Sequence, residues 1–226
     1  MSVICSDPKS SDVVDTMDAS ARKLGIMKRI SLAMAIVAVL ASAGPSWSGD
    51  GDPASVRNCT WCHGTSAQGY TVAPRLAGQR AEYIEEQLRS LREHTRDNPF
   101  SKQYMWSAVD ALHSNAPRDL AMYFSSLAPK AANDGHRDSA AKGRTIYLEG
   151  IPESNIVSCL ACHGPDAEGV RQIPRLGGLS YYYLKSRLEQ WGQGYHSGPD
   201  SPMPRVASRL GPDEIEALAS YLSFVK

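Results

Sequence analysis

Apolar positions in two stretches of the chain, residues 83–91 and 183–191, recur three to four residues apart. This spacing matches the period of about 3.6 residues that places side chains on one face of an α-helix. The predicted faces contain Tyr83, Ile84, Gln87, Leu88 and Leu91, matched by Tyr183, Leu184, Arg187, Leu188 and Trp191, and only Gln87 and Arg187 among them are polar. The pattern therefore predicts two amphipathic helices with similar faces.

Two further helices are predicted, one on the C-terminal side of each of these stretches. One runs from about Asn115 to Leu127. The other begins at Gly211-Pro212-Asp213-Glu214, where acidic residues fall in the first turn, and continues to Val225. Because no run of alternating β-branched residues occurs, the expected fold class is all-α.

The chain contains an internal repeat. Matches with an offset of 100 residues are followed by matches with an offset of 98, so a two-residue deletion separates them. The first set pairs Gly64, Gly69, Pro74, Arg75, Leu76, Gly78, Tyr83 and Leu88 with Gly164, Gly169, Pro174, Arg175, Leu176, Gly178, Tyr183 and Leu188. The second set pairs Met105, Leu112, Leu120 and Tyr123 with Met203, Leu210, Leu218 and Tyr221. Two homologous units in tandem are predicted.

Residues 128–140 are small, polar and turn-prone, and they are expected to form the linker between the units. The predicted domains are therefore 44–130 and 131–226. A short linker would keep the two units in a fixed neighbourhood.

Residues 1–43 have the features of a leader. Lys28 and Arg29 form a basic segment, residues 30–40 are apolar, and Ala41-Ser42-Ala43 is a cleavage pattern. Met27 is the better start, which makes residues 1–26 an over-called start of the reading frame. An uncleaved membrane anchor is the alternative, although the apolar run is shorter than the ~20 residues a transmembrane helix needs. Export to the periplasm is the expectation.

Composition excludes several classes of protein. The chain has 226 residues, 42% of them hydrophobic and 21% charged, so it can form a packed core and is not predicted to be disordered. Its 24 basic and 24 acidic side chains balance, and no basic stripe indicates a nucleic-acid partner.

Four of the five cysteines fall in two motifs, Cys59-Thr-Trp-Cys62-His63 and Cys159-Leu-Ala-Cys162-His163. Two thiols at this spacing can each form a thioether with a haem vinyl group, and the adjacent His is then placed to bind the iron. A four-thiolate zinc site is the main alternative, but it leaves both histidines without a role. A disulfide or a redox dithiol in each pair is less consistent with the sequence. Two covalent haem c groups are predicted.

A second axial ligand decides whether such an iron is closed or open to other molecules. Met105 and Met203 occupy matching positions in the two units, and Pro202 and Pro204 flank the second. They are predicted to ligate the two irons, with core packing as the alternative. Met122 has no counterpart and is expected in the core. His94, His196, His113 and His136 are rival ligands without counterparts, and a solvated loop position suits them better.

These residues resemble the class I cytochromes c, and their tandem arrangement resembles the dihaem cytochrome c4 family. The resemblance rests on residues 59–64, 74–79, Met105 and 121–127, with their counterparts in the second unit, and covers nearly all of the chain after the leader. It implies two small helical bundles, each around one covalent haem. It also implies that the carbonyls of Pro74 and Pro174 face the iron-binding histidines, a contact that would fix each ring. Arg75 and Arg175 are candidates for neutralising haem propionates, with a solvated position as the alternative.

The resemblance implies an electron carrier, not an enzyme, with positive potentials at both haems. Its partners would be a quinol-oxidising complex and a terminal oxidase or reductase. One departure is that residues 49–58 are too short and polar to supply the helix that usually opens such a domain. This feature resembles cytochrome subunits bound to flavoprotein dehydrogenases. An electron-accepting subunit of a flavoprotein or quinoprotein dehydrogenase is therefore the first alternative, and a haem peroxidase or sensor with one open site is the second.

Overall fold

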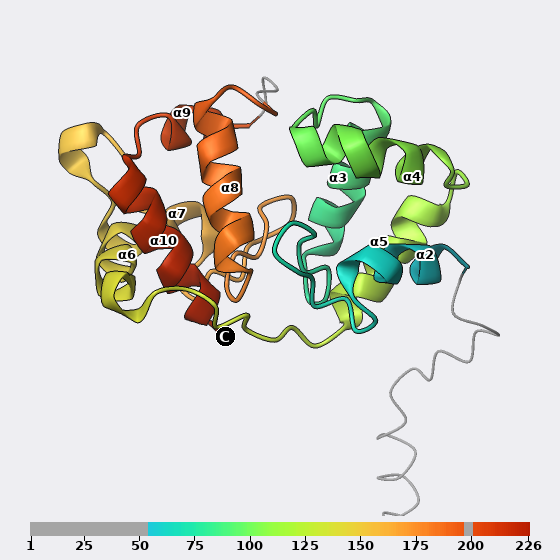
Figure 1. The fold of residues 1–226 in the computed structure, drawn as a ribbon, viewed down its shortest axis with the longest axis horizontal. Helices are drawn as coiled ribbons and strands as arrows, with labels where there is room; N and C mark the ends of the chain where they lie inside the picture. Colours follow the sequence, from blue (N-terminus) through green and yellow to red (C-terminus); the bar gives the residue numbers. More distant parts are fainter. Residues whose placement is uncertain (1–53, 197–200) are drawn as a thin grey trace, which may run out of the picture. The chain divides into compact units, whose positions relative to one another are not determined.

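The computed structural model describes residues 54–196 and 201–226 (Figure 1). Both repeats lie in one compact unit, Gly51–Lys226. Its helices are α2 (Ala54–His63), α3 (Ala81–Arg92), the π-helical turn η1 (Ser101–Met105), α4 (Trp106–Asp110), α5 (Ala116–Ser126), α6 (Arg137–Glu149), the 3₁₀ turn η2 (Pro152–Ser154), α7 (Leu160–His163), α8 (Tyr181–Gly192), α9 (Met203–Ala207) and α10 (Pro212–Phe224). Within the described ranges, β pairing is limited to two isolated bridges, Ile151–Ile156 and Val170–Ile173. The expected all-α class is confirmed.

The repeat seen in the sequence is present in the helices. Helices α3 and α8 are the two predicted amphipathic helices, and α5 and α10 are the predicted closing helices. Helix α10 begins where its sequence signal lies, because the Glu214 carboxylate accepts a hydrogen bond of 2.7 Å from the Gly211 N–H. The cysteine motifs lie on α2 and α7.

The core of the second repeat forms where α6 and α8 pack against α10. Tyr147, Leu184 and Leu218 are among its fully buried members. At the crossing of α6 and α10, Gly143 lies so close to the backbone of Ala217 that a Cβ atom on it would be 1.9 Å from the Ala217 carbonyl oxygen. The absence of a side chain at residue 143 therefore sets how closely these two helices approach.

The first repeat has a smaller core between α3 and α5. Val56, Ile84, Leu120 and Phe124 are buried there. Among the described residues of this repeat, no helix corresponds to α6. Met122 on α5 is 53% exposed, so the prediction that it fills the core was wrong. The matching residue of α10, Ser220, is fully buried and receives a hydrogen bond from Ser139 of α6.

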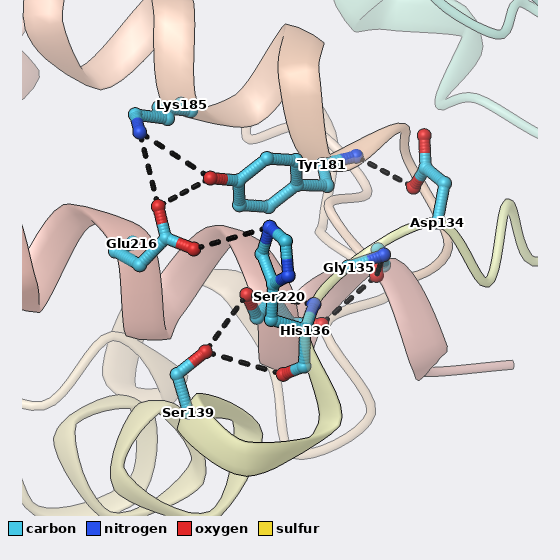
Figure 2. A network of polar contacts seen from close by, with 9 residues as sticks. Asp134, Gly135, His136, Ser139, Tyr181, Lys185, Glu216 and Ser220 are labelled. Atoms are coloured by element: carbon cyan, nitrogen blue, oxygen red, sulfur yellow. Dashed lines mark hydrogen bonds and ion pairs between the residues drawn. The ribbon is translucent and has the colours of Figure 1, made fainter.

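The segment between the repeats is shorter than predicted, because α6 begins at Arg137 rather than after residue 140. The C-terminal end of this linker segment is held by hydrogen bonds with the second repeat (Figure 2). Asp134 accepts hydrogen bonds from Ser180 and from the Tyr181 N–H at the start of α8. The His136 N–H donates to Ser220, and its ring lies edge-on to Tyr181 at 5.0 Å. The prediction that the linker extends to residue 140 is therefore corrected.

Two other predictions concern the start of the chain. Residues 54–58 are helical and form the first part of the cysteine-motif helix α2. The expectation that residues 49–58 are too short and polar to supply the helix that opens the domain stays a prediction. The predicted leader, residues 1–43, lies outside the described residues, as do residues 44–53. Within the described ranges, no helix is long and apolar enough to span a membrane.

Candidate haem sites

The first cysteine motif forms the C-terminal turns of α2. Cys59 is half-buried and Cys62 is exposed, and both thiols are free. His63 is the last residue of the helix and is only 6% exposed. One helical turn separates Cys59 from Cys62, so the two sulfur atoms and the histidine ring belong to adjacent positions of one short segment.

The second motif repeats this arrangement. Cys159 precedes α7, Cys162 lies within it, and His163 ends it with the same exposure as His63. Cys159 is half-buried, Cys162 is exposed, and both are free. In both repeats the chain then turns through a glycine with positive φ, Gly64 or Gly164, which a residue with a side chain would adopt only under strain.

Each motif histidine is held by a proline carbonyl. The Nδ1 atom of His63 is 2.7 Å from the Pro74 oxygen, and that of His163 is 3.0 Å from the Pro174 oxygen. A carbonyl can only accept, so Nδ1 is the protonated ring nitrogen and Nε2 carries the lone pair. This is the arrangement expected of a metal-binding histidine. The implied contacts of Pro74 and Pro174 are present.

The surroundings of the motifs favour neutral rings and protonated thiols. Burial lowers the pKa of His63 and of His163 below the usual range, although the proline carbonyl opposes this in each case. Burial also raises the pKa of Cys59 and of Cys159 to about 11. A redox dithiol needs a thiol with a lowered pKa, so the interpretation of these pairs as thioredoxin-like sites is not supported.

Zinc binding is not supported either. Among the residues that the structure describes, which include all four motif cysteines, no three His, Cys, Asp or Glu side chains are grouped as a metal site. The two motifs lie on separate helices, α2 and α7, each with its own histidine and proline. The two motifs therefore form two equivalent sites rather than two halves of a single zinc site.

The predicted methionine ligands lie at matching places in the fold. Met105 is the last residue of η1, immediately before α4, and Met203 is the first residue of α9. Both are partly buried, and Met203 packs against the core of the second repeat. Ligation of iron by Met105 and Met203 stays a prediction.

The rival histidines have different surroundings. His94 stacks on Trp106 at 4.0 Å and is about half exposed, consistent with a loop position. His196 is partly buried, and its Nδ1 atom accepts a hydrogen bond of 3.1 Å from Arg187. The expectation that His196 is solvated is therefore corrected. The ring faces a buried guanidinium instead.

A group of buried basic and phenolic side chains was not foreseen from the sequence. Arg96 donates to Gln87 at 2.9 Å and to the Tyr183 hydroxyl at 3.3 Å. The buried Arg187 guanidinium lies over the Trp191 ring, 4.6 Å from its centroid. Burial raises the pKa of Tyr83 to about 12, so this phenol stays neutral. The only sequence signal was that Tyr83 and Tyr183 match in the repeat.

Several buried donors near these residues lack an acceptor. Within the described part of the chain, the unpaired atoms are Nε of Arg80, Arg96 and Arg175, and Nε1 of Trp191. A buried donor without an acceptor is costly, so such atoms indicate a missing polar group. A porphyrin carries carboxylates, which are strong acceptors for guanidinium and indole N–H groups. These residues therefore fit a haem whose acidic edge replaces the missing acceptors.

Arg75 and Arg175 differ although they match in the repeat. Arg75 is 4% exposed and uses four of its five N–H groups on backbone carbonyls. Its acceptors are Ala77, Lys130, Gly177 and Gly178. Arg75 is not solvated, so that alternative is wrong, while its role beside a haem propionate stays a prediction. Arg175 retains an unpaired Nε and remains a candidate for a propionate partner.

The helical fold and the two cysteine–histidine motifs, each with its histidine held by a proline carbonyl, define a class I c-type cytochrome. Comparison with known proteins agrees. Residues 140–226 match the model of the cytochrome c family. Cytochrome c-552 of Acidithiobacillus ferridurans is 31% identical over 217 residues, which cover 92% of this chain and 93% of that protein. The chain belongs to the cytochrome c4 family of dihaem class I cytochromes.

Two further similarities bear on function. A protein of Stutzerimonas stutzeri named thiosulfate dehydrogenase electron acceptor is 36% identical over 183 residues, 78% of this chain and 82% of that protein. The solved structure of cytochrome c4 from Acidithiobacillus ferrooxidans superposes with a TM-score of 0.68 at 32% identity. The superposition covers 74% of this chain and 98% of the cytochrome c4 chain. An electron-transfer role with covalently bound haem c follows from the family.

Proposed function

We propose that this chain is a periplasmic electron carrier with two covalent haem c groups. Cys59 and Cys62 would hold the first haem and Cys159 and Cys162 the second, with predicted domains 44–130 and 131–226. His63 and Met105, and His163 and Met203, would be the axial ligands of the two irons. The observation that supports this most directly is the duplicated hydrogen bond from the motif histidine to a proline carbonyl.

The bound haem supplies one-electron reduction and oxidation of its iron with little change in geometry. The chain supplies the rest. Each proline carbonyl keeps the histidine ring in one tautomer and orientation, and the half-buried Cys59 and Cys159 would each hold the haem through a thioether. A methionine on the opposite side would close the iron to other ligands and favour its reduced state, so we expect positive potentials at both sites.

Location in the periplasm rests on the predicted leader, residues 1–43, with its cleavage pattern before Gly44. The partners would be redox proteins. A quinol-oxidising complex and a terminal oxidase or reductase suit a diffusing carrier.

A dehydrogenase is the second candidate partner. It is favoured by the similarity to proteins named thiosulfate dehydrogenase electron acceptor, from Stutzerimonas stutzeri and from Thiomonas intermedia. Copurification of a dehydrogenase with the protein from its source would favour this role over that of a diffusing carrier.

The decisive experiment is absorption spectroscopy of the mature protein, produced with a haem-attachment system, before and after carbon monoxide is added. The expected result is two haems per chain and no spectral change in the reduced protein, because both irons are closed by protein ligands. Met105→Ala and Met203→Ala should each open one iron and bind one equivalent of carbon monoxide. Binding of carbon monoxide to the unaltered protein would favour the peroxidase or sensor alternative.

A further inference from the structure

The side chain of Gln79, in the first repeat, contacts the backbone of the second repeat. Gln79 is 6% exposed, and its amide makes two hydrogen bonds with one residue, Arg175. Its Nε2 donates to the Arg175 carbonyl at 2.9 Å, and its Oε1 accepts from the Arg175 N–H at 2.7 Å. This paired contact fixes both the distance and the orientation of the two backbone segments.

The Arg175 N–H belongs to the same peptide group as the Pro174 carbonyl. Because a peptide group is planar, holding the N–H also sets the direction of the carbonyl on its other side. That carbonyl accepts the hydrogen bond from Nδ1 of His163. A continuous series therefore runs from the His163 ring through the Pro174–Arg175 peptide to the Gln79 amide. Hydrogen bonds in such a series polarise and strengthen one another.

Gln79 is itself held in place. Its Oε1 also accepts from the Arg80 N–H at 2.9 Å, and its own N–H donates to Leu76 at 3.1 Å. The neighbouring Arg75 guanidinium binds the carbonyls of Gly177 and Gly178. A side chain at residue 178 would be strained, because φ there is +73° and a Cβ atom would lie 2.9 Å from the Ala131 Cα atom. The crossing of the two segments is thus rigid enough for Gln79 to act as a positioning residue.

The second repeat has no matching side chain that could make the same contact with the first repeat. The residue that matches Gln79 in the second repeat is Leu179, whose side chain has no polar atom. Leu179 therefore cannot support the peptide of Pro74 and Arg75, whose carbonyl holds His63. Two histidines with the same motif consequently have different supports.

We infer that Gln79 of the first repeat is a positioning residue for the axial histidine of the second, and that it sets the reduction potential at His163 from across the repeat boundary. The inference rests on the proposed function, since it requires haem iron at both histidines. The expected direction follows from ligand basicity. A stronger acceptor at Nδ1–H makes the ring a better donor to the metal, which favours the oxidised iron. Loss of the Gln79 amide should therefore raise the potential at His163 and leave that at His63 unchanged.

The test compares Gln79→Met with Gln68→Met in the mature dihaem protein. Methionine keeps the length of glutamine and removes the amide. Gln68 is the matched control because its amide also makes backbone hydrogen bonds, three in all with Ser66, Ala128 and Lys130, but makes none with Arg175. The potentials of both haems are measured by redox titration. To assign each potential to its haem, the same variants are also made in a protein that carries Met105→His. Ligation by two histidines lowers the first potential and so separates it from the second.

A second readout is the exchange of the histidine ring protons with solvent, measured by ¹⁵N NMR in the reduced protein. In Gln79→Met the Nδ1 proton of His163 should exchange several-fold faster, while that of His63 is unchanged. Gln79→Asn, whose amide is one methylene too short, is measured in the same way if Gln79→Met does not mature. An equal effect of Gln79→Met and Gln68→Met, or a shift of both potentials or of neither, would overturn the inference. Carbon monoxide binding to the unaltered protein would count against the proposed function instead.

Discussion

Residues at matching positions of the two repeats have acquired different roles. Arg75 binds four carbonyls, whereas Arg175 keeps an unpaired nitrogen. Gln79 binds the backbone of the other repeat, whereas Leu179 is a core residue. A pair of equivalent positions in the sequence is therefore not a pair of equivalent environments.

His196 gives a prediction at this scale. Its pKa is lowered from 6.5 to about 4, first by burial and then by the guanidinium groups of Arg96 and Arg187, with Asp97 opposing them. Between pH 6.5 and about 4 the unfolded chain binds a proton at this ring and the folded protein does not. Stability should therefore fall as the pH falls through this window. In His196→Gln that part of the pH dependence should be missing, as measured by denaturant unfolding at several pH values.

His113→Gln is the matched control, because His113 is an exposed residue. The stability of His113→Gln should depend on pH as that of the unaltered protein does. An unchanged pH dependence in His196→Gln would mean that burial and the neighbouring guanidinium groups do not lower the pKa of this ring.

At the scale of elements, the two repeats differ most in the helix that covers the closing helix. Helix α6 packs along α10, and the crossing depends on Gly143. The corresponding face of α5 includes the exposed Met122, and no described helix of the first repeat covers it. The second repeat therefore has the larger core and is expected to be the more stable of the two.

Gly143→Ala tests the helix crossing. The added methyl group would meet the backbone of Ala217, which cannot move without shifting α10. Alanine favours an isolated helix over glycine, so the intrinsic effect would be stabilising by about 1 kcal/mol. The steric effect should outweigh it and destabilise the protein by roughly 1–3 kcal/mol, as expected for overpacking. Thermal unfolding followed by circular dichroism measures the difference.

Arg144→Ala, at an exposed position of the same helix, serves as the control and should change stability little. A Gly143→Ala protein as stable as this control would show that α6 and α10 can separate at no cost.

At the scale of the whole molecule, hydrogen bonds between the repeats are made largely by side chains with backbone groups. Arg75 and Gln79 reach Gly177, Gly178 and Arg175 from the first repeat. The Arg75 guanidinium has no carboxylate partner, and burial lowers its pKa to about 10. The two units should therefore unfold together rather than as independent domains.

Arg75→Met tests this coupling. It removes the Arg75 donors to the Lys130, Gly177 and Gly178 carbonyls. The Gly178 carbonyl keeps a hydrogen bond from the Ala132 N–H, and a buried carbonyl that loses its partner costs about 1–3 kcal/mol. The expected result is a loss of roughly 2–4 kcal/mol and a change from one unfolding transition to two, seen by comparing the haem absorption with circular dichroism. Arg57→Met, which alters an exposed arginine of α2, should unfold as the unaltered protein does. One sharp transition in Arg75→Met would show that other contacts couple the repeats.

Much of this molecule could be predicted from the sequence. The repeat, the helices around residues 83–91, 116–126, 183–191 and 212–224, and the positions of the cysteine motifs all follow from local spacing, and local spacing is what fixes helical faces and cap positions. Errors arose where a distant segment decides the outcome. Met122 is exposed because nothing described covers its face of α5, and the linker ends early because Ser220 and Asp134 organise the start of α6 and α8.

The sequence by itself determined the chemistry of this protein, because thioether attachment and iron binding require particular residues at a short spacing along the chain. It also determined the family and the all-α fold, since helical periodicity is local. Only the tertiary structure decided which side chains cross between the repeats. Residues 79 and 175 are far apart in the sequence, and their contact depends on the packing of the segments around them. No local pattern distinguishes a glutamine that supports a distant histidine from one in contact with water.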